Sequence, residues 1–189
     1  MYRNNNCAVP SNLSPKQQQL YNTLRRLWME HVLWTRFFIV STAFDLPDLE
    51  YVTNRLLRNP ADFAYVLRPL YGSERAMRFA NLLTDHLQIA GQLVNAAKAG
   101  DTGSADRLRE KWYLNASEIA SFLSELNPCW DVITWRELLY DHLKMTENEA
   151  TYILSGEYTA GIDQYAAIQE EALIMADVMA RGIIGQFRI

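Results

Sequence analysis

The sequence is short of helix breakers, of cysteine and of histidine. Its 189 residues include eight glycines, six prolines, two cysteines and three histidines. Scarce glycine and proline favour long helices over strands that are joined by tight turns. A chain of this length can bury a substantial core in one domain without staples.

The chain also lacks an excess of basic charge and any long apolar run. Lys and Arg number 18 against 22 Asp and Glu, which gives a net charge of −4. Nucleic acids and anionic membranes bind basic surfaces, so we expect neither as a partner. The longest apolar run, residues 37–44, is too short to span a bilayer, and the first residues form no signal-peptide core.

The two cysteines, Cys7 and Cys129, stand alone in the sequence. Without a CxxC pair they predict neither a disulfide framework nor a cysteine zinc site. We therefore expect reduced thiols and a cytoplasmic location.

Apolar residues recur at steps of three and four along the chain, and no segment alternates with period two. This pattern predicts an all-α fold. Because the loops are short, we expect an up-and-down bundle of about six helices arranged as three antiparallel hairpins. We expect one domain over residues 14–189, after a disordered polar tail over residues 1–13. The expected helices cover residues 15–44, 49–70, 74–99, 102–126, 132–154 and 160–184.

Two local signals refine these helices. Ser14, Pro15 and Gln17 have the spacing of a capping box with proline at the first helical position. Pro60 predicts a kink directly after Asn59, because proline cannot donate to the helical ladder and disfavours helical geometry in the residue before it.

Two of the three histidines lie in nearly the same motif, LLTDHL at residues 82–87 and LLYDHL at residues 138–143. His31, His86 and His142 are 55 and 56 residues apart, and a polar residue follows each of them in the next helix. These polar residues are Asn59, Asn115 and Glu171, each 56 residues from the next. The spacing predicts a hairpin that is internally repeated.

The same spacing predicts a shared level in the bundle. Each histidine lies about 14 residues before its hairpin turn and each Asn or Glu about 14 after it, so at about 1.5 Å per residue both lie roughly 20 Å from the turn. The histidines have apolar or small neighbours one turn away, which puts them on buried faces. An unpaired buried polar group costs about 1–3 kcal/mol, so these six must bond to one another or to a ligand.

Several interpretations of this layer are open. The first is one transition metal ion (Zn, Fe or Mn) that His31, His86, His142 and Glu171 hold, with Asn59 and Asn115 as second-rank ligands. No Glu-x-x-His pair is present, so a mononuclear site is favoured over a dinuclear one.

The alternative is a hydrogen-bonded layer that only fixes packing, as a buried Asn does in coiled coils. That alternative predicts an interaction protein, a homo-oligomer, with an exposed apolar patch around Phe187 and residues 182–187. An apolar ligand pocket is a further alternative. An enzyme would need an open pocket beside the layer, and the sequence contains no GxSxG, P-loop or GxGxxG motif.

Two other acids have apolar surroundings. Asp177 lies among apolar neighbours and is expected to pair with Arg36 or Arg55. Glu149, two turns after His142, is expected at the rim of the layer or in a salt bridge. The acids directly before the histidines, Glu30, Asp85 and Asp141, point about 100° away from them and should reach a flanking helix or solvent.

Residues 27–63 (LWMEHVLWTRFF…RNPADF), 85–101 (DHLQIAGQLVNAAKAGD) and 172–187 (ALIMADVMARGIIGQF) resemble a family of small all-helical proteins from spore-forming bacteria. The resemblance covers almost the whole chain after residue 15. Some relatives carry the label acetylglutamate kinase, an α/β enzyme class whose Gly-rich phosphate loops this sequence lacks. The family has no established activity, so the resemblance implies no functional residue. In outline the bundle is also similar to ferritin-like metal-binding bundles, although it lacks their Glu-x-x-His pattern.

Overall fold

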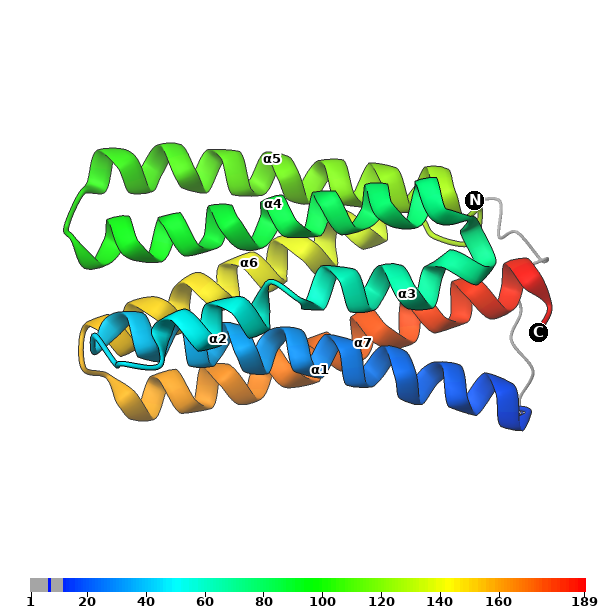
Figure 1. Cartoon of the computed structure of the whole chain (residues 1–189), viewed down its shortest axis with the longest axis horizontal. Helices are drawn as coiled ribbons and strands as arrows, with labels where there is room; N and C mark the ends of the chain where they lie inside the picture. The colour runs from blue at the N-terminus through cyan, green and yellow to red at the C-terminus, as the bar shows by residue number, and fades with distance from the viewer. Residues whose placement is uncertain (1–6, 8–11) are drawn as a thin grey trace.

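The computed structural model describes Cys7 and residues 12–189, and every long regular element in these residues is an α-helix (Figure 1). The elements are α1 (Pro15–Ala43), α2 (Leu49–Leu56), α3 (Asn59–Tyr71), α4 (Ser73–Lys98), α5 (Thr102–Leu126), α6 (Val132–Leu154) and α7 (Tyr158–Phe187). The predicted all-α bundle is confirmed. The predicted tail, residues 1–13, lies largely outside the described residues.

The helices run along one long axis of the molecule (Figure 1). The α1–α2, α4–α5 and α6–α7 turns meet at one end, whereas the α3–α4 and α5–α6 turns and the last turn of α7 lie at the other. Here α1 packs against α7, and α4 packs against both α3 and α5. None of the helices in the described residues combines the length and hydropathy that crossing a membrane requires.

The first helix starts as the sequence predicts. Ser14 Oγ accepts the Gln17 backbone N–H at 3.2 Å, and Gln17 Oε1 accepts the Ser14 backbone N–H at 2.8 Å. This reciprocal capping box satisfies two donors that the first turn leaves free.

The second predicted helix is two helices, α2 and α3. The break falls at Leu57 and Arg58, so the predicted kink after Asn59 is wrong by two residues. Pro60 lies instead in the first turn of α3, where its missing N–H breaks no helical bond. Asn59 thereby starts a helix and is completely buried.

The last turns of α7 are covered, and the exposed apolar patch predicted around Phe187 is wrong. Residues 182–185 are buried, and the Phe187 ring packs edge-on against Tyr71 with 5.2 Å between centroids. Gly185 allows a close approach here, because a Cβ on it would lie 3.0 Å from Cys7 Cα. Cys7 lies against this end of the helix and helps to cover it.

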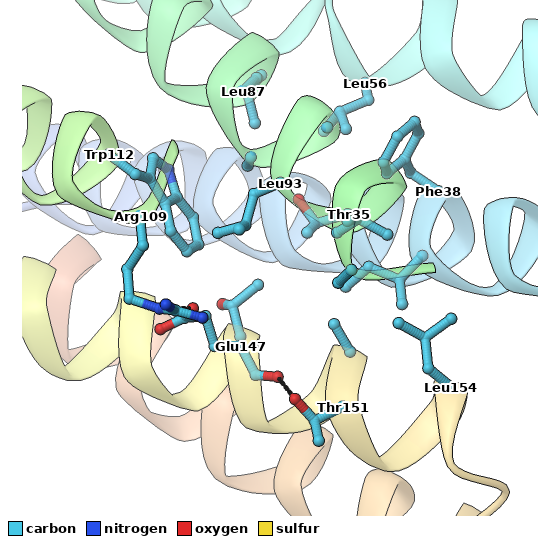
Figure 2. A pocket seen from close by; sticks show the side chains of 17 residues that line it. Thr35, Phe38, Leu56, Leu87, Leu93, Arg109, Trp112, Glu147, Thr151 and Leu154 are labelled. Carbon is cyan, nitrogen blue, oxygen red and sulfur yellow. Dashed lines mark hydrogen bonds and ion pairs between the residues drawn. The ribbon is translucent and has the colours of Figure 1, made fainter. Parts of the chain in front are cut away.

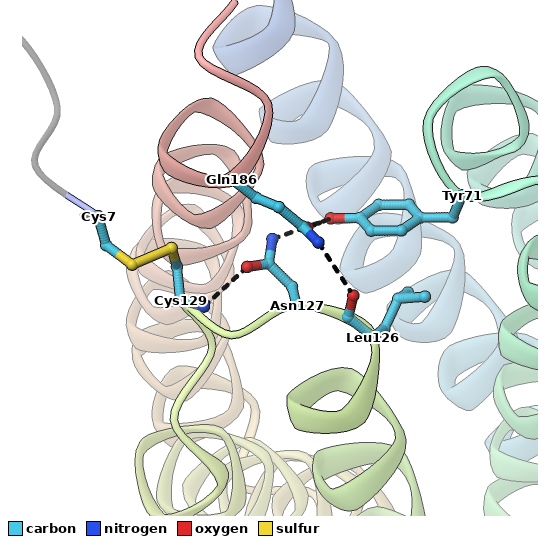
Figure 3. The surroundings of a disulfide bond; sticks show 6 residues. All are labelled: Cys7, Tyr71, Leu126, Asn127, Cys129 and Gln186. Atoms are coloured by element: carbon cyan, nitrogen blue, oxygen red, sulfur yellow. Dashed lines mark hydrogen bonds between the residues drawn. A yellow bond between two sulfur atoms is a disulfide. The ribbon is translucent and has the colours of Figure 1, made fainter. Parts of the chain in front are cut away.

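Cys7 and Cys129 form a disulfide, with 5.6 Å between their Cα atoms (Figure 3). The expectation of reduced thiols is therefore wrong, and the argument from cysteine for a cytoplasmic location falls with it. Asn127 shapes the turn that presents Cys129: its Oδ1 accepts the Cys129 N–H at 2.8 Å and its Nδ2 donates to Tyr71 Oη at 2.9 Å. The two cysteines are 122 residues apart, so only the fold brings them together.

We expect the disulfide to contribute strongly to stability. Closing a loop of 122 residues restricts the unfolded chain, so Cys129→Ser should lower the free energy of unfolding by about 2–5 kcal/mol. Urea denaturation with and without reductant measures this. Reduced wild type should match the variant, and equal stability of oxidised and reduced wild type would contradict the expectation.

Candidate functional site

The predicted polar residues meet in pairs, one pair for each histidine. The Nδ1 atoms of His31, His86 and His142 lie 3.1, 2.9 and 3.1 Å from Asn59 Oδ1, Asn115 Oδ1 and Glu171 Oε2. The partners are 28, 29 and 29 residues apart in the sequence. All six side chains are buried, the most exposed being Glu171 at 8%.

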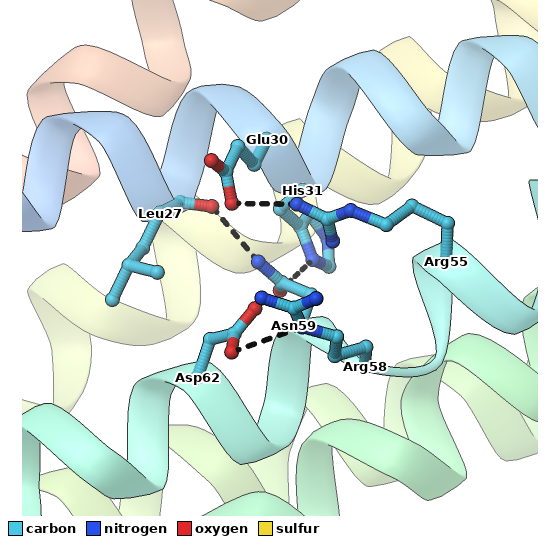
Figure 4. A network of polar contacts seen from close by, with 7 residues as sticks. All are labelled: Leu27, Glu30, His31, Arg55, Arg58, Asn59 and Asp62. Atoms are coloured by element: carbon cyan, nitrogen blue, oxygen red, sulfur yellow. Dashed lines mark hydrogen bonds and ion pairs between the residues drawn. The ribbon is translucent and has the colours of Figure 1, made fainter.

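Each asparagine also binds the backbone of the helix that carries its histidine. Asn59 Nδ2 donates to Leu27 O at 3.0 Å (Figure 4), and Asn115 Nδ2 donates to Leu82 O at 3.1 Å. Because the amide nitrogen serves the carbonyl, the amide oxygen faces the imidazole, and the Nδ1 atom must carry the hydrogen. The amide therefore fixes both the position and the tautomer of the ring.

The third pair differs, since Glu171 replaces asparagine. Its Oε2 accepts from His142 Nδ1, whereas its Oε1 is buried without a hydrogen-bond partner among the described residues. A buried carboxylate oxygen without a partner costs free energy, so this pair is the least satisfied of the three.

The three imidazoles are neighbours in one layer. The centroid of the His31 ring lies 6.4 Å from that of His86 and 5.7 Å from that of His142. Burial, together with the neighbouring imidazoles, lowers the pKa of both His31 and His86 to about 3. Both rings are therefore neutral near pH 7.

The acids that precede the histidines lie outside the layer, as expected. Glu30 Oε2 accepts from Arg55 of α2 at 3.0 Å (Figure 4), and Asp85 and Asp141 are exposed.

The two other acids that the sequence singled out form ion pairs. Glu149 is buried and pairs with Arg36, and burial raises the pKa of its carboxyl to about 6 although Arg36 lowers it. Asp177 pairs with Arg25 through two contacts of 2.7 Å, so the predicted partners Arg36 and Arg55 are wrong. Those two arginines are already paired with Glu149 and Glu30.

A metal site gains no support from this geometry. Among the described residues, no three His, Cys, Asp or Glu side chains lie where they could share one metal ion. Each hydrogen bond of the layer uses the Nδ1 atom of its ring. The Nε2 atom, whose lone pair would bind a metal, takes no part in these bonds. The metal ion remains a hypothesis, and the pairwise bonding is what the structural alternative expects.

A pocket that sequence reasoning missed opens one helical turn from the layer (Figure 2). The space inside it that is open to water-sized molecules is about 70 Å³, and the volume is about 600 Å³ when the solvent at its mouth is included. Its lining comes from α1, α2, α4, α5 and α6: Thr35, Phe38, Ile39, Leu56, Leu87, Ala90, Gly91, Leu93, Val94, Ala97, Arg109, Trp112, Thr146, Glu147, Ala150, Thr151 and Leu154.

The position of the pocket follows the spacing of the histidines. Thr35, Ala90 and Thr146 each lie four residues after a histidine, one turn further along α1, α4 and α6. These side chains are small, so the space between the three helices is left unfilled at this level. These three small residues are the feature of the sequence that could have indicated the pocket. A hydrophobic pattern gives small residues little weight, because they fit both buried and exposed positions.

Two polar features lie in the lining of the pocket, the Trp112 indole and the Arg109–Glu147 ion pair. Trp112 packs against the His86 ring with 5.2 Å between centroids, and its buried Nε1 has no hydrogen-bond partner among the described residues. Arg109 and Glu147 lie on the side nearer solvent, with 2.6 Å between Nε and Oε1. Figure 2 shows these side chains in a lining that is otherwise apolar apart from threonines.

Comparison with known proteins found no match to a family model, to a curated protein or to a solved structure.

Acid should destabilise the protein through the layer. The pKa of His31 and of His86 is about 3 in the folded protein and about 6.5 when unfolded, so the unfolded chain binds more protons below pH 6.5. Each histidine then removes about 1.4 kcal/mol per pH unit. Glu149 acts in the opposite direction, because the raised pKa of its carboxyl makes the folded protein bind a proton more readily between its ordinary pKa and about 6. This offsets about one of the two histidines, and the other still lowers the free energy of unfolding. Urea denaturation from pH 7 to 4.5 measures it, and unchanged stability would contradict it.

Removing one imidazole should cost stability whether or not metal is supplied. His86→Ala leaves a cavity and an unpaired Asn115 Oδ1, which together cost about 2–5 kcal/mol. Asp85→Asn, next to it on the exposed face, should be nearly neutral. Thermal melts of wild type with chelator and with added zinc should coincide. A melting temperature that falls with chelator in wild type but not in His86→Ala would establish the metal ion instead.

Proposed function

We propose that this protein binds a small apolar molecule in the pocket between α1, α2, α4, α5 and α6. The observation that carries the proposal is that the side chains one turn beyond the three histidines, on three different helices, are all small. They leave an open, mainly apolar space inside a packed bundle. Ligand sites in helical bundles lie between helices and combine an apolar lining with a few polar groups.

The histidine layer forms the floor beneath this pocket. A cavity in a packed core tends to collapse, because neighbouring side chains gain contacts by moving into it. Here each pair ties its histidine to a partner helix, and the three imidazole rings pack side by side, so Thr35, Ala90 and Thr146 stay aligned one turn further on. In this proposal the polar layer is structural, and it preserves a binding site.

The lining favours binding over catalysis. Of the residues that line the pocket only Arg109 and Glu147 are ionisable, and they are paired with each other. A general acid or base needs a proton that it can give to or take from a bound molecule, and a mutually paired Arg and Glu are poorly suited to that.

Filling the pocket should abolish binding. Nile red, a neutral apolar dye, should bind wild type with saturable fluorescence and raise its melting temperature. Ala90→Phe places a ring in the pocket and should weaken the dye's affinity about tenfold or more.

The matched control is Asn81→Phe, exposed on the same helix and outside the lining. It adds the same ring and should bind the dye like wild type. Equal binding by Ala90→Phe, with its fold intact by circular dichroism, would overturn the proposal.

A further inference from the structure

The side chains of the pocket also indicate which class of molecule it takes. Apart from Arg109 and Glu147 the lining is aliphatic or aromatic, with threonine as the other polar type. The hydroxyls of Thr35 and Thr146 donate to His31 O and His142 O, each at 2.8 Å. These hydroxyl hydrogens are therefore committed to the backbone and do not serve a ligand.

Trp112 supplies a donor that the protein itself does not use. Its indole is 3% exposed, and Nε1 has no acceptor among the described residues. An unmade hydrogen bond of a buried donor costs about 1–3 kcal/mol, which an acceptor on a bound molecule would recover. Trp28, Trp130 and Trp135 also have buried Nε1 atoms with no partner in the part of the chain that the structure describes, but of the four only Trp112 lines the pocket.

The mouth disfavours an anion. Arg109 is held by two carboxylates, with Nε 2.6 Å from Glu147 and Nη1 2.6 Å from Asp106. These three groups sum to one negative charge, so a ligand carboxylate would meet repulsion there. Deeper in, a single indole N–H cannot replace the hydration of a charged group.

From these contacts we propose that the ligand is neutral and largely apolar, and that it carries one hydrogen-bond acceptor, such as a carbonyl oxygen, to which Trp112 Nε1 donates. This inference rests on the proposed function. Trp112 is thus a specificity-determining residue, and the Arg109–Glu147–Asp106 group selects against carboxylates.

Three molecules of similar size test the class by competition with Nile red: acetophenone, which has the acceptor, ethylbenzene, which lacks it, and phenylacetate, which is charged. Trp112→Phe should weaken acetophenone about three- to tenfold more than ethylbenzene. The smaller ring changes the pocket wall for both molecules, whereas the lost N–H donor affects only the one with an acceptor. Phenylacetate should bind wild type at least about tenfold more weakly than acetophenone.

Trp135→Phe is the matched control, since it removes an equally buried, unpartnered N–H outside the lining. It should leave the ratio of the two neutral affinities as in wild type. In wild type the ¹H–¹⁵N signal of the Trp112 indole should move downfield with acetophenone and not with ethylbenzene. This measurement needs no variant and so does not depend on whether Trp112→Phe folds.

The two proposals fail in different ways. If Nile red does not bind, or binds Ala90→Phe as well as wild type, the ligand-binding function fails and the inference with it. If the dye binds in the pocket but Trp112→Phe weakens both neutral molecules equally, the inference alone is overturned. Equal binding of phenylacetate and acetophenone would also overturn the inference alone.

Discussion

The hydrogen bond between each buried histidine and its polar partner on a neighbouring helix is the constraint on which the rest of the structure depends. Both partners lie in the core, so a slip of one residue between two helices would strand a donor and an acceptor at about 1–3 kcal/mol each. Three such pairs, at separations of 28, 29 and 29 residues, fix the register of α1 with α3, of α4 with α5 and of α6 with α7. The His31 ring then lies beside the rings of His86 and His142, which places α1, α4 and α6 at one height. A purely apolar seam would leave the register of these long helices less well defined.

This layer divides the bundle into two unlike halves. On the side of the α3–α4 turn, Trp28 packs against His31, Phe63 and Trp135 with centroid distances of 5.7, 5.3 and 6.4 Å, and the core is filled with rings. On the other side the chain places Thr, Ala and Thr at the corresponding turn of the same helices, and the pocket opens. Because the layer holds all three helices level, small residues at equivalent positions add up to one cavity instead of several separate gaps.

The level of the layer could be predicted because helical rise is constant, so equal sequence distances from a turn become equal heights. Rotation about the helix axis and contacts between distant segments follow no such rule. The predicted partners of Asp177 were wrong for a different reason. Arg36 lies roughly 16 Å further along α1 than Arg25, and Arg55 lies on α2, so neither is at the height of Asp177, which pairs with Arg25. The bond between Cys7 and Cys129 depends on where a turn meets the far end of α7. The pocket could not be predicted from the sequence, because alanine and threonine occur both in filled cores and beside cavities.

The same hydrogen bonds bear on whether the layer could bind a metal ion. A partner on Nδ1 is what a metal-binding histidine needs, because it presents Nε2 as the free lone pair. A shared ion would then require three Nε2 atoms within about 2.0–2.1 Å of one point. Among the described residues, no three His, Cys, Asp or Glu side chains are placed to meet at such a point, and Asn59 and Asn115 are tied to the backbone at Leu27 O and Leu82 O. Turning the three rings toward one point would strain the hydrogen bonds within the hairpins. The contacts that make the layer a good structural element therefore oppose its contraction around an ion.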